Sequence, residues 1–146
     1  MQGSQLKRTL LLSTLLSLGI QSTGFSLALG ELDVKSALNQ IFLGRIEISD
    51  LDVPVDEVQV RVASPEDFKR IGLEYDETVD DLTFTLQTQH RGFGLIIIKS
   101  KHRIEKPFIE LLLDVEWAEG RMYRAYTIFI DPPNYPITPA TKQKAT

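Results

Sequence analysis

The chain has 146 residues, of which 42% are hydrophobic and 25% are charged, a composition typical of one folded domain and not of a disordered or fibrous protein. Its formal net charge of −4 at pH 7 excludes the basic surface that nucleic-acid binding requires. It has no cysteine, so disulfides and a cysteine nucleophile are excluded, and the core must be held by burial alone.

The first 28 residues have the organisation of a secretory signal peptide. Lys7-Arg8 forms a basic start, residues 10–20 are mostly apolar, and Ser26-Leu27-Ala28 fits the small-x-small pattern that signal peptidase cuts. We therefore expect export and cleavage between Ala28 and Leu29. An uncleaved membrane anchor is the alternative, because residues 10–29 are about long enough to span a bilayer, although serine, threonine and glutamine interrupt them.

Five stretches of alternating or continuous apolar residues predict strands in the middle of the chain. Between them, polar and turn-forming residues predict a bend at Leu38-Asn39-Gln40, a loop over the acidic residues 74–81, a hairpin turn at Gly92-Phe93-Gly94 and a connection over residues 101–107. The five predicted strands are residues 32–35, 45–48, 58–62, 82–87 and 95–98.

One short helix is predicted after the third strand. Ser64 can cap it, Pro65 suits its first position, and Asp67 lies three residues after the cap. Gly72 is suited to a left-handed stop. A helix of only about two turns depends on packing against the rest of the domain.

Residues 107–133 predict a long β-hairpin, because apolar residues occupy every second position of its first arm. We place a two-residue turn at Glu119-Gly120, which pairs Trp117 with Met122 and puts Arg124 opposite Val115. A three-residue turn with Gly120 as a bulge is the alternative. The apolar positions are Ile109, Leu111, Leu113, Val115 and Trp117, and the polar positions assigned to the wet face are Glu110, Asp114 and Glu116.

Seven short strands with one short helix predict an all-β fold, an antiparallel two-sheet sandwich of the immunoglobulin-like kind. The Cys–Trp–Cys pattern of true immunoglobulin domains is absent from the sequence. We expect residues 1–28 to be the signal peptide, residues 29–133 the sandwich domain, and residues 134–146 a disordered tail with little to bury.

The sequence has no recognisable catalytic pattern, so we expect no enzymatic activity, no cofactor and no bound metal. His90 and His102 are its only histidines, and both are predicted at the surface; no serine stands in a Gly-x-Ser-x-Gly elbow. Five carboxylates in the acidic loop could offer oxygen ligands to calcium, but their spacing is not that of an EF-hand, and a solvated loop is favoured. These residues are Glu74, Asp76, Glu77, Asp80 and Asp81.

A basic cluster precedes the predicted hairpin and consists of Lys99, Lys101, His102, Arg103 and Lys106. One interpretation is protection of a strand edge from unwanted pairing. The other is recognition of an acidic partner, for which Lys101 and Arg103 are the candidate residues. The strand at residues 32–35 lies at the chain's free end, where an exposed sheet edge can accept a partner segment.

Three segments, in this order and spacing, resemble the N-terminal periplasmic domain of the FimV family, which serves type IV pilus assembly and motility in Gram-negative bacteria. The resemblance covers roughly residues 29–133. One departure is Ile41-Phe42, where the family usually has Pro-Leu. The segments are Leu29 to Gln40, Val60 to Phe68 with Gly72-Leu73, and Trp117 to Arg121 with Tyr126-Thr127 and Asp131-Pro132-Pro133.

The resemblance implies a periplasmic, non-enzymatic domain that contacts envelope or pilus-assembly proteins near the pilus or its secretin. The alternative is a peptidoglycan- or envelope-binding module unrelated to pili. Long FimV proteins continue into a LysM module, a transmembrane helix and an acidic cytoplasmic region, whereas this sequence stops at Thr146, so we do not expect it to join wall, membrane and cytoplasm as they do. The sequence gives neither the partner nor the oligomeric state.

Overall fold

The computed structural model describes residues 27–133, so the predicted tail and almost all of the predicted signal peptide lie outside the described residues. The described part folds into seven strands and one α-helix, with two 3-10 helices. In chain order the elements are β1 (Ala28–Val34), β2 (Gln40–Leu51), η1 (Val55–Glu57), β3 (Gln59–Val62), α1 (Pro65–Ile71), η2 (Glu77–Asp81), β4 (Leu82–His90), β5 (Gly92–Ile104), β6 (Phe108–Trp117) and β7 (Gly120–Phe129).

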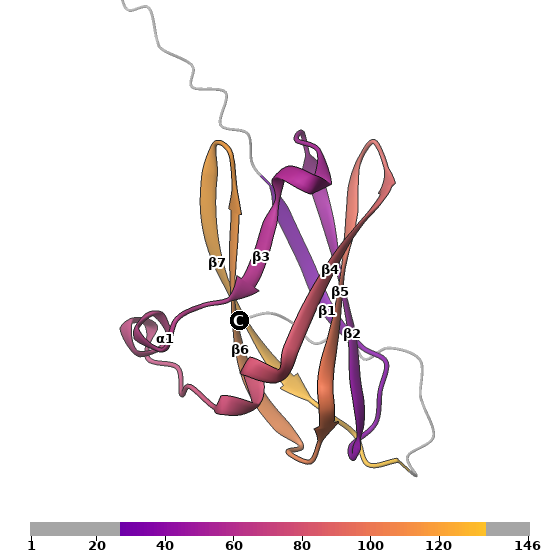
Figure 1. Ribbon diagram of the computed structural model, residues 1–146, viewed down its shortest axis with the longest axis vertical. Coiled ribbons are helices and arrows are strands. Elements are labelled where there is room, and N and C mark those ends of the chain that lie inside the picture. Colours follow the sequence, from indigo (N-terminus) through magenta and orange to yellow (C-terminus); the bar gives the residue numbers. More distant parts are fainter. Residues whose placement is uncertain (1–26, 134–146) are drawn as a thin grey trace, which may run out of the picture.

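The strands form two antiparallel sheets that face each other, as the prediction has it (Figure 1). One sheet has the order β1-β2-β5-β4 and the other β3-β6-β7. Lettered A to G along the chain, these are ABED and CFG, the strand order of a constant-type immunoglobulin domain. The edge strands are therefore β1 and β4 in the larger sheet and β3 and β7 in the smaller one.

The core lies between the sheets and is built from the inward residues of the central strands. Period-two alternation puts Ile46 and Ile48 of β2 and Ile96 and Ile98 of β5 on the inner face, where none of the four is accessible to solvent. Leucines, valine and isoleucine of β6 and β7 meet them from the other sheet. The fully buried side chains include Ile46, Ile48, Ile96 and Ile98 on one side and Leu111, Leu113, Val115 and Ile128 on the other.

The helix forms as the sequence predicts. The Ser64 hydroxyl accepts the N–H of Asp67, the Asp67 carboxylate accepts the N–H of Ser64, and Gly72 ends the helix with φ 78°. Helix α1 lies on the outer side of the smaller sheet (Figure 1), where the Arg70 guanidinium lies 5.7 Å from the ring centre of Tyr123 on β7. Of the apolar helix residues, Phe68 is fully buried while Ile71 is half exposed.

The hairpin of β6 and β7 has the predicted inner face but not the predicted register. Trp117 pairs with Gly120 and Val115 with Met122, so the turn is Ala118-Glu119 and every partner is shifted by two residues. Gly120 lies under the indole, since a Cβ there would come 2.7 Å from Cζ2 of Trp117. The glycine makes room for the tryptophan ring. Neither turn residue has a positive φ, so Glu119 stands in the turn without backbone strain.

The other corrections concern the polar stretches and one strand residue. β5 is a central strand as predicted, but it extends from Gly92 through Ile104, so the residues from Lys101 to Ile104 are strand and not connection. Phe93 and Gly94 likewise belong to β5, and the reversal lies at Arg91. The end of the acidic loop is the 3-10 helix η2. Asp114, assigned to the wet face, is 2% exposed.

Candidate interaction surface

The basic cluster lies at a bulge in β5, where three residues stand opposite one residue of β2. Leu43 pairs with Lys99 and Ile41 with Arg103, so Phe42 alone stands opposite Ser100, Lys101 and His102. The Phe42 N–H donates to the Ser100 hydroxyl at 2.8 Å, and that hydroxyl donates to the His102 carbonyl. The buried serine thus satisfies main-chain groups that the ladder leaves unpaired, and Lys101, His102 and Arg103 are all exposed.

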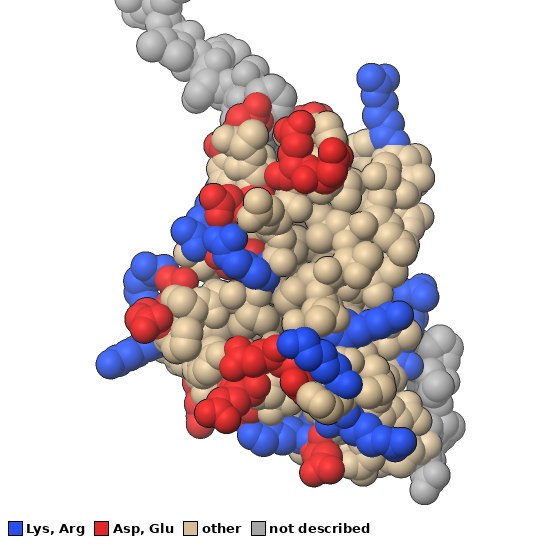
Figure 2. Space-filling view, in the orientation of Figure 1, with Lys and Arg blue, Asp and Glu red and all other residues tan. Residues whose placement is uncertain are grey.

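Two members of the cluster contact carboxylates of the acidic loop. His102 Nδ1 lies 2.7 Å from Asp81, and Lys106 forms an ion pair with Asp76. The Lys106 ammonium, with the hydroxyl and N–H of Thr78, lowers the pKa of Asp76 to about 2. Figure 2 shows acidic and basic side chains next to one another at the lower end of the molecule.

The other three members, which we call the β5 cations, are Lys99, Lys101 and Arg103. All three are exposed, and within residues 27–133 none has a carboxylate in ion-pair distance. The Arg103 guanidinium donates to the Asn39 carbonyl at 3.1 Å, which holds it at the edge of the bulge. Both predicted partner-binding residues therefore lie on one strand with free positive charge.

The predicted edge strand β1 is an edge of the larger sheet, but β7 closes part of it. The Tyr126 hydroxyl donates to the Gly30 carbonyl at 2.9 Å, across the opening between the two sheets. Burial of the tyrosine raises its pKa to about 12. Below Gly30 the edge is open: the Lys35 N–H donates inward to Leu43, so the N–H of Val34 points outward.

The histidines and the carboxylates of the acidic loop do not form a common site. His90 stacks on Phe93 at 4.9 Å at the far end of β5 from His102, so the two exposed histidines do not meet. In the acidic loop, Asp80 accepts the Tyr75 hydroxyl and raises that phenol's pKa to about 12. Among the described residues no three His, Cys, Asp or Glu side chains gather as a metal site would need.

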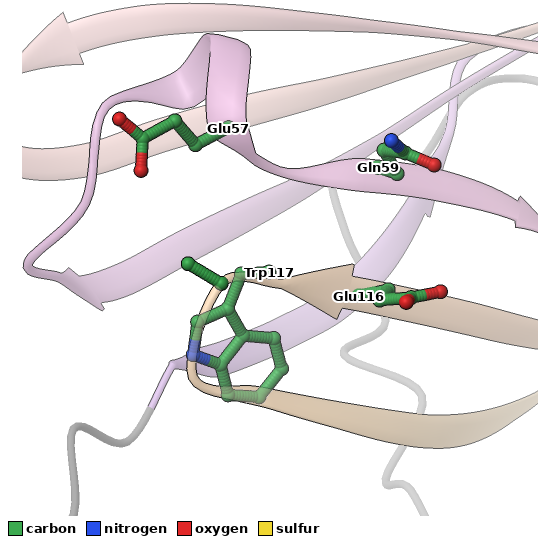
Figure 3. Close-up of a pocket in the computed structure, with 5 residues that line it drawn as sticks. Glu57, Gln59, Glu116 and Trp117 are labelled. Atoms are coloured by element: carbon green, nitrogen blue, oxygen red, sulfur yellow. The ribbon is translucent and has the colours of Figure 1, made fainter.

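The described surface includes a smaller and a larger hollow. The smaller, about 380 Å³, lies by Glu57, Gln59, Glu116 and Trp117, and Figure 3 shows the Trp117 ring turned to the side of β6 opposite to Glu116. The larger, about 740 Å³, lies on the outer face of the larger sheet among Glu31, Asp33, Glu47 and Phe93. An active site requires polar groups that converge on one point, and those of the smaller hollow do not.

An ion-pair network that the sequence analysis missed lies on the outer face of the smaller sheet. Arg121 holds both oxygens of Asp114, through Nε and Nη2 at 2.7 Å each. Arg61 reaches the same carboxylate through Nε at 2.8 Å and Glu116 through Nη2 at 2.8 Å. The hydrogen bonds from Arg121 are the main cause of the lowered pKa of Asp114, and they raise the pKa of Arg121.

A sequence signal for this network exists in the strand register. Arg61 and Tyr123 flank Asp114 on the neighbouring strands, and Arg121 is one position along the same face. Only the correct hairpin register brings these residues together, because the register expected from a Glu119-Gly120 turn displaces Arg121 by two positions.

Comparison with known proteins identifies the family of this domain. The family described as the FimV N-terminal domain, an Ig-like domain, matches residues 27–133, the whole described sandwich. The chain belongs to this FimV family. The motility hub protein FimV of Pseudomonas aeruginosa is 35% identical over 129 residues in both strain PAO1 and strain UCBPP-PA14. The match covers 82% of this chain but 14% of those relatives, and no solved structure gives a significant match.

The fold explains why the three FimV-like segments occur together. The first and third meet where Tyr126 bonds to Gly30, and the second and third meet where Arg61 and Arg121 hold Asp114. The segments therefore carry structural contacts between strands. Ala28 and Leu29, the predicted cleavage residues, lie at the start of β1, where Leu29 is buried. No helix in the described part of this FimV-family chain is long and apolar enough to cross a membrane.

Proposed function

We propose that the domain is a non-enzymatic protein-interaction module of the cell envelope, acting in the periplasm during assembly of the type IV pilus or its secretin. Membership of the FimV family and likeness to proteins named motility hub support a role in motility. An immunoglobulin-like sandwich supports binding, because it offers open edges and rigid loops to other proteins.

The observation that carries the proposal is the set of β5 cations, which have no ion pair among residues 27–133, on a chain that is acidic overall. Charge complementarity assigns them an acidic partner segment. Exposed charges of this kind act mainly on the rate of association and on its salt dependence. The open part of the β1 edge, around Val34, offers main-chain groups for the same segment to pair with.

Site-specific cross-linking in a piliated Gram-negative host tests the proposal. A photoreactive residue in place of Ile41, which is half exposed and pairs with Arg103, captures whatever approaches the β5 cations. We expect identified products to be pilus or secretin components. Products that contain only peptidoglycan would instead support an envelope-binding module without a pilus role, and the absence of any product would refute the assignment of this surface.

A matched pair of charge reversals then tests the cations themselves. Lys101→Glu should reduce capture, and the double variant with Arg103→Glu should reduce it further, each with an unchanged melting temperature. Lys69→Glu is the control, because Lys69 is exposed on α1 and has no ion pair among the described residues. If capture changes neither with Lys101→Glu nor with salt between about 50 and 500 mM, the β5 cations do not take part in partner binding.

A further inference from the structure

The four edge strands of the described sandwich are unequally protected against pairing with another chain. β1 carries Glu31, Asp33 and Lys35 and is partly closed by Tyr126. β3 has four residues and leads into Pro65. β7 carries Arg121 and points Arg124 toward the interior beside Leu113. Charges, short length and inward charges are the usual devices that prevent edge-to-edge association.

β4 has neither charges nor short length, and its one irregularity is a register shift between Thr88 and His90 at its C-terminal end. Its nine residues, Leu82-Thr83-Phe84-Thr85-Leu86-Gln87-Thr88-Gln89-His90, include no proline, aspartate, glutamate, lysine or arginine. In Figure 2 the surface over β4 is uncharged, and charged side chains gather only near the two ends of the strand. A long uncharged edge of this kind is a template for strand addition.

The free main-chain groups of β4 can be identified from the hydrogen bonds of its neighbours. The main-chain N–H and C=O of Leu43 point toward β1, since the carbonyl accepts from the Lys35 N–H and the N–H donates to the Ser36 hydroxyl. The main-chain groups of Lys99, which stands opposite Leu43 on β5, therefore point toward β4, where Lys99 pairs with Thr83. The alternate residues of β4 point away from the sheet. They are Leu82, Phe84, Leu86 and Thr88, of which Leu82 has its N–H bonded to the Val79 carbonyl, so the free groups are those of Phe84, Leu86 and Thr88.

The side chains at this edge are also incompletely covered. Phe84 and Leu86 are only half buried, whereas Ile98 and Ile96, which stand opposite them on β5, are completely buried. A further strand beside β4 would extend the sheet over the exposed parts of both side chains. Hydrogen bonds and apolar burial would then both favour its addition.

We propose that the strand added to β4 is the β4 of a second copy, in an antiparallel dimer whose two-fold axis passes between the two Leu86 residues. Leu86 would then pair with the partner's Leu86, and Phe84 with the partner's Thr88, all of which have outward main-chain groups. The axis is perpendicular to the sheet, so the core faces of the two copies remain on the same side.

Charge complementarity selects this occupant and this direction. Asp81, the last residue of η2, whose carboxylate also contacts His102, precedes β4, and the turn residue Arg91 follows it, so antiparallel pairing about Leu86 brings Asp81 toward the partner's Arg91 at both ends. The inference goes beyond the proposed function, because β4 and β1 are opposite edges of the sheet. A single strand pair buries less than the roughly 1,200 Å² of a standard interface, so the dimer is weak and concentration-dependent.

Sedimentation equilibrium of the protein purified from its host's envelope tests the proposal, over roughly 10 μM to 1 mM, the range of weak association. The wild type should pass from monomer toward dimer. Asp81→Arg alone and Arg91→Glu alone each place like charges together at both ends, and each should weaken association about tenfold. An equimolar mixture of the two variants should associate again, because both ends become complementary.

Two proline substitutions, one on each edge strand of the larger sheet, show which of the two edges is used. Thr88→Pro removes an outward N–H of β4 and should abolish association, while Val34→Pro does the same to β1 and should leave association intact. Circular dichroism melts establish that each variant is folded. An unchanged monomer throughout the concentration range, dimerisation that survives Thr88→Pro, or a variant mixture that fails to associate would each overturn the proposal. Because the charge-swap mixture needs no proline, it remains decisive if Thr88→Pro does not fold.

Discussion

Replacing Asp114 by asparagine removes the negative charge at the centre of the outer network and keeps the size of the side chain. Asp114 is 2% exposed, accepts two hydrogen bonds from Arg121 at 2.7 Å each and forms an ion pair with Arg61 at 2.8 Å. Breaking a buried ion pair costs about 3–5 kcal/mol when the remaining charge is left in the interior. Here the two arginine side chains are 45% and 46% exposed, so water can solvate them, and we expect a loss of about 2–3 kcal/mol.

The dependence on pH identifies the source of this loss. The folded pKa of Asp114 is lowered, so its contribution to stability is fully present above the unfolded pKa of about 3.9 and disappears as pH falls through the folded value. Urea unfolding of wild type and Asp114→Asn should therefore differ by a constant amount from pH 7 to 5, and the difference should shrink below pH 4. Glu116→Gln is the control: its side chain is 48% exposed, and its loss should be about 0.5 kcal/mol or less. A difference for Asp114→Asn that persists unchanged at pH 2 would refute the electrostatic reasoning.

Three other predictions concern packing and processing. Leu113→Ala should lower the free energy of unfolding by about 2–5 kcal/mol, because Leu113 is completely buried, and denaturant melts measure it. Gly120→Ala should cost about 1–3 kcal/mol and shift the fluorescence of Trp117, since the new Cβ collides with the indole; an unshifted spectrum would contradict this contact. N-terminal sequencing of the envelope protein should begin at Leu29, and recovery of an intact amino terminus in the membrane fraction would favour the anchor instead.

The features that depend on local chemistry could be predicted from the sequence. Ser64, Pro65, Asp67 and Gly72 specify the two ends of α1 by short-range hydrogen bonds and backbone preferences, and the structure has the helix between them. Alternation on β6 likewise identifies the face that meets the other sheet, because each residue's side depends only on its parity, although Leu112 and Asp114 on the opposite face are buried too. The sandwich follows from the number and spacing of the strands.

The features that depend on contacts between distant residues could not be predicted in this way. The register of β6 and β7 is set by the fit of Trp117 over Gly120, which a turn rule does not contain. β5 continues through polar residues because the Ser100 hydroxyl takes the place of a main-chain partner for Phe42. Asp114 is buried because Arg61 of β3 and Arg121 of β7 reach it. Arg61 and Asp114 are more than fifty residues apart in the sequence.

The same limit applied to the candidate surface. Lys101 and Arg103 could be selected from the sequence as free cations, but the pairing of their neighbours Lys106 and His102 with the acidic loop required the fold. The low pKa of Asp76 is a property of that pairing. The uncharged composition of β4 can be read from the sequence, but only the sheet order makes β4 an edge strand.

The placement of the domain's two ends has a mechanical consequence. The Leu38 N–H donates to the Asp131 carbonyl, so the chain leaves the sandwich beside the bend that follows β1, at the opposite end from Leu27 (Figure 1). A pull between the ends would act along β1 and β7 and load their ladders in shear, so that several hydrogen bonds must break together. Tyr126 adds a tie between the two loaded strands at Gly30. Under tension the lifetime of such a link is governed by the rate of unfolding, and a change that spares the equilibrium stability can still shorten it.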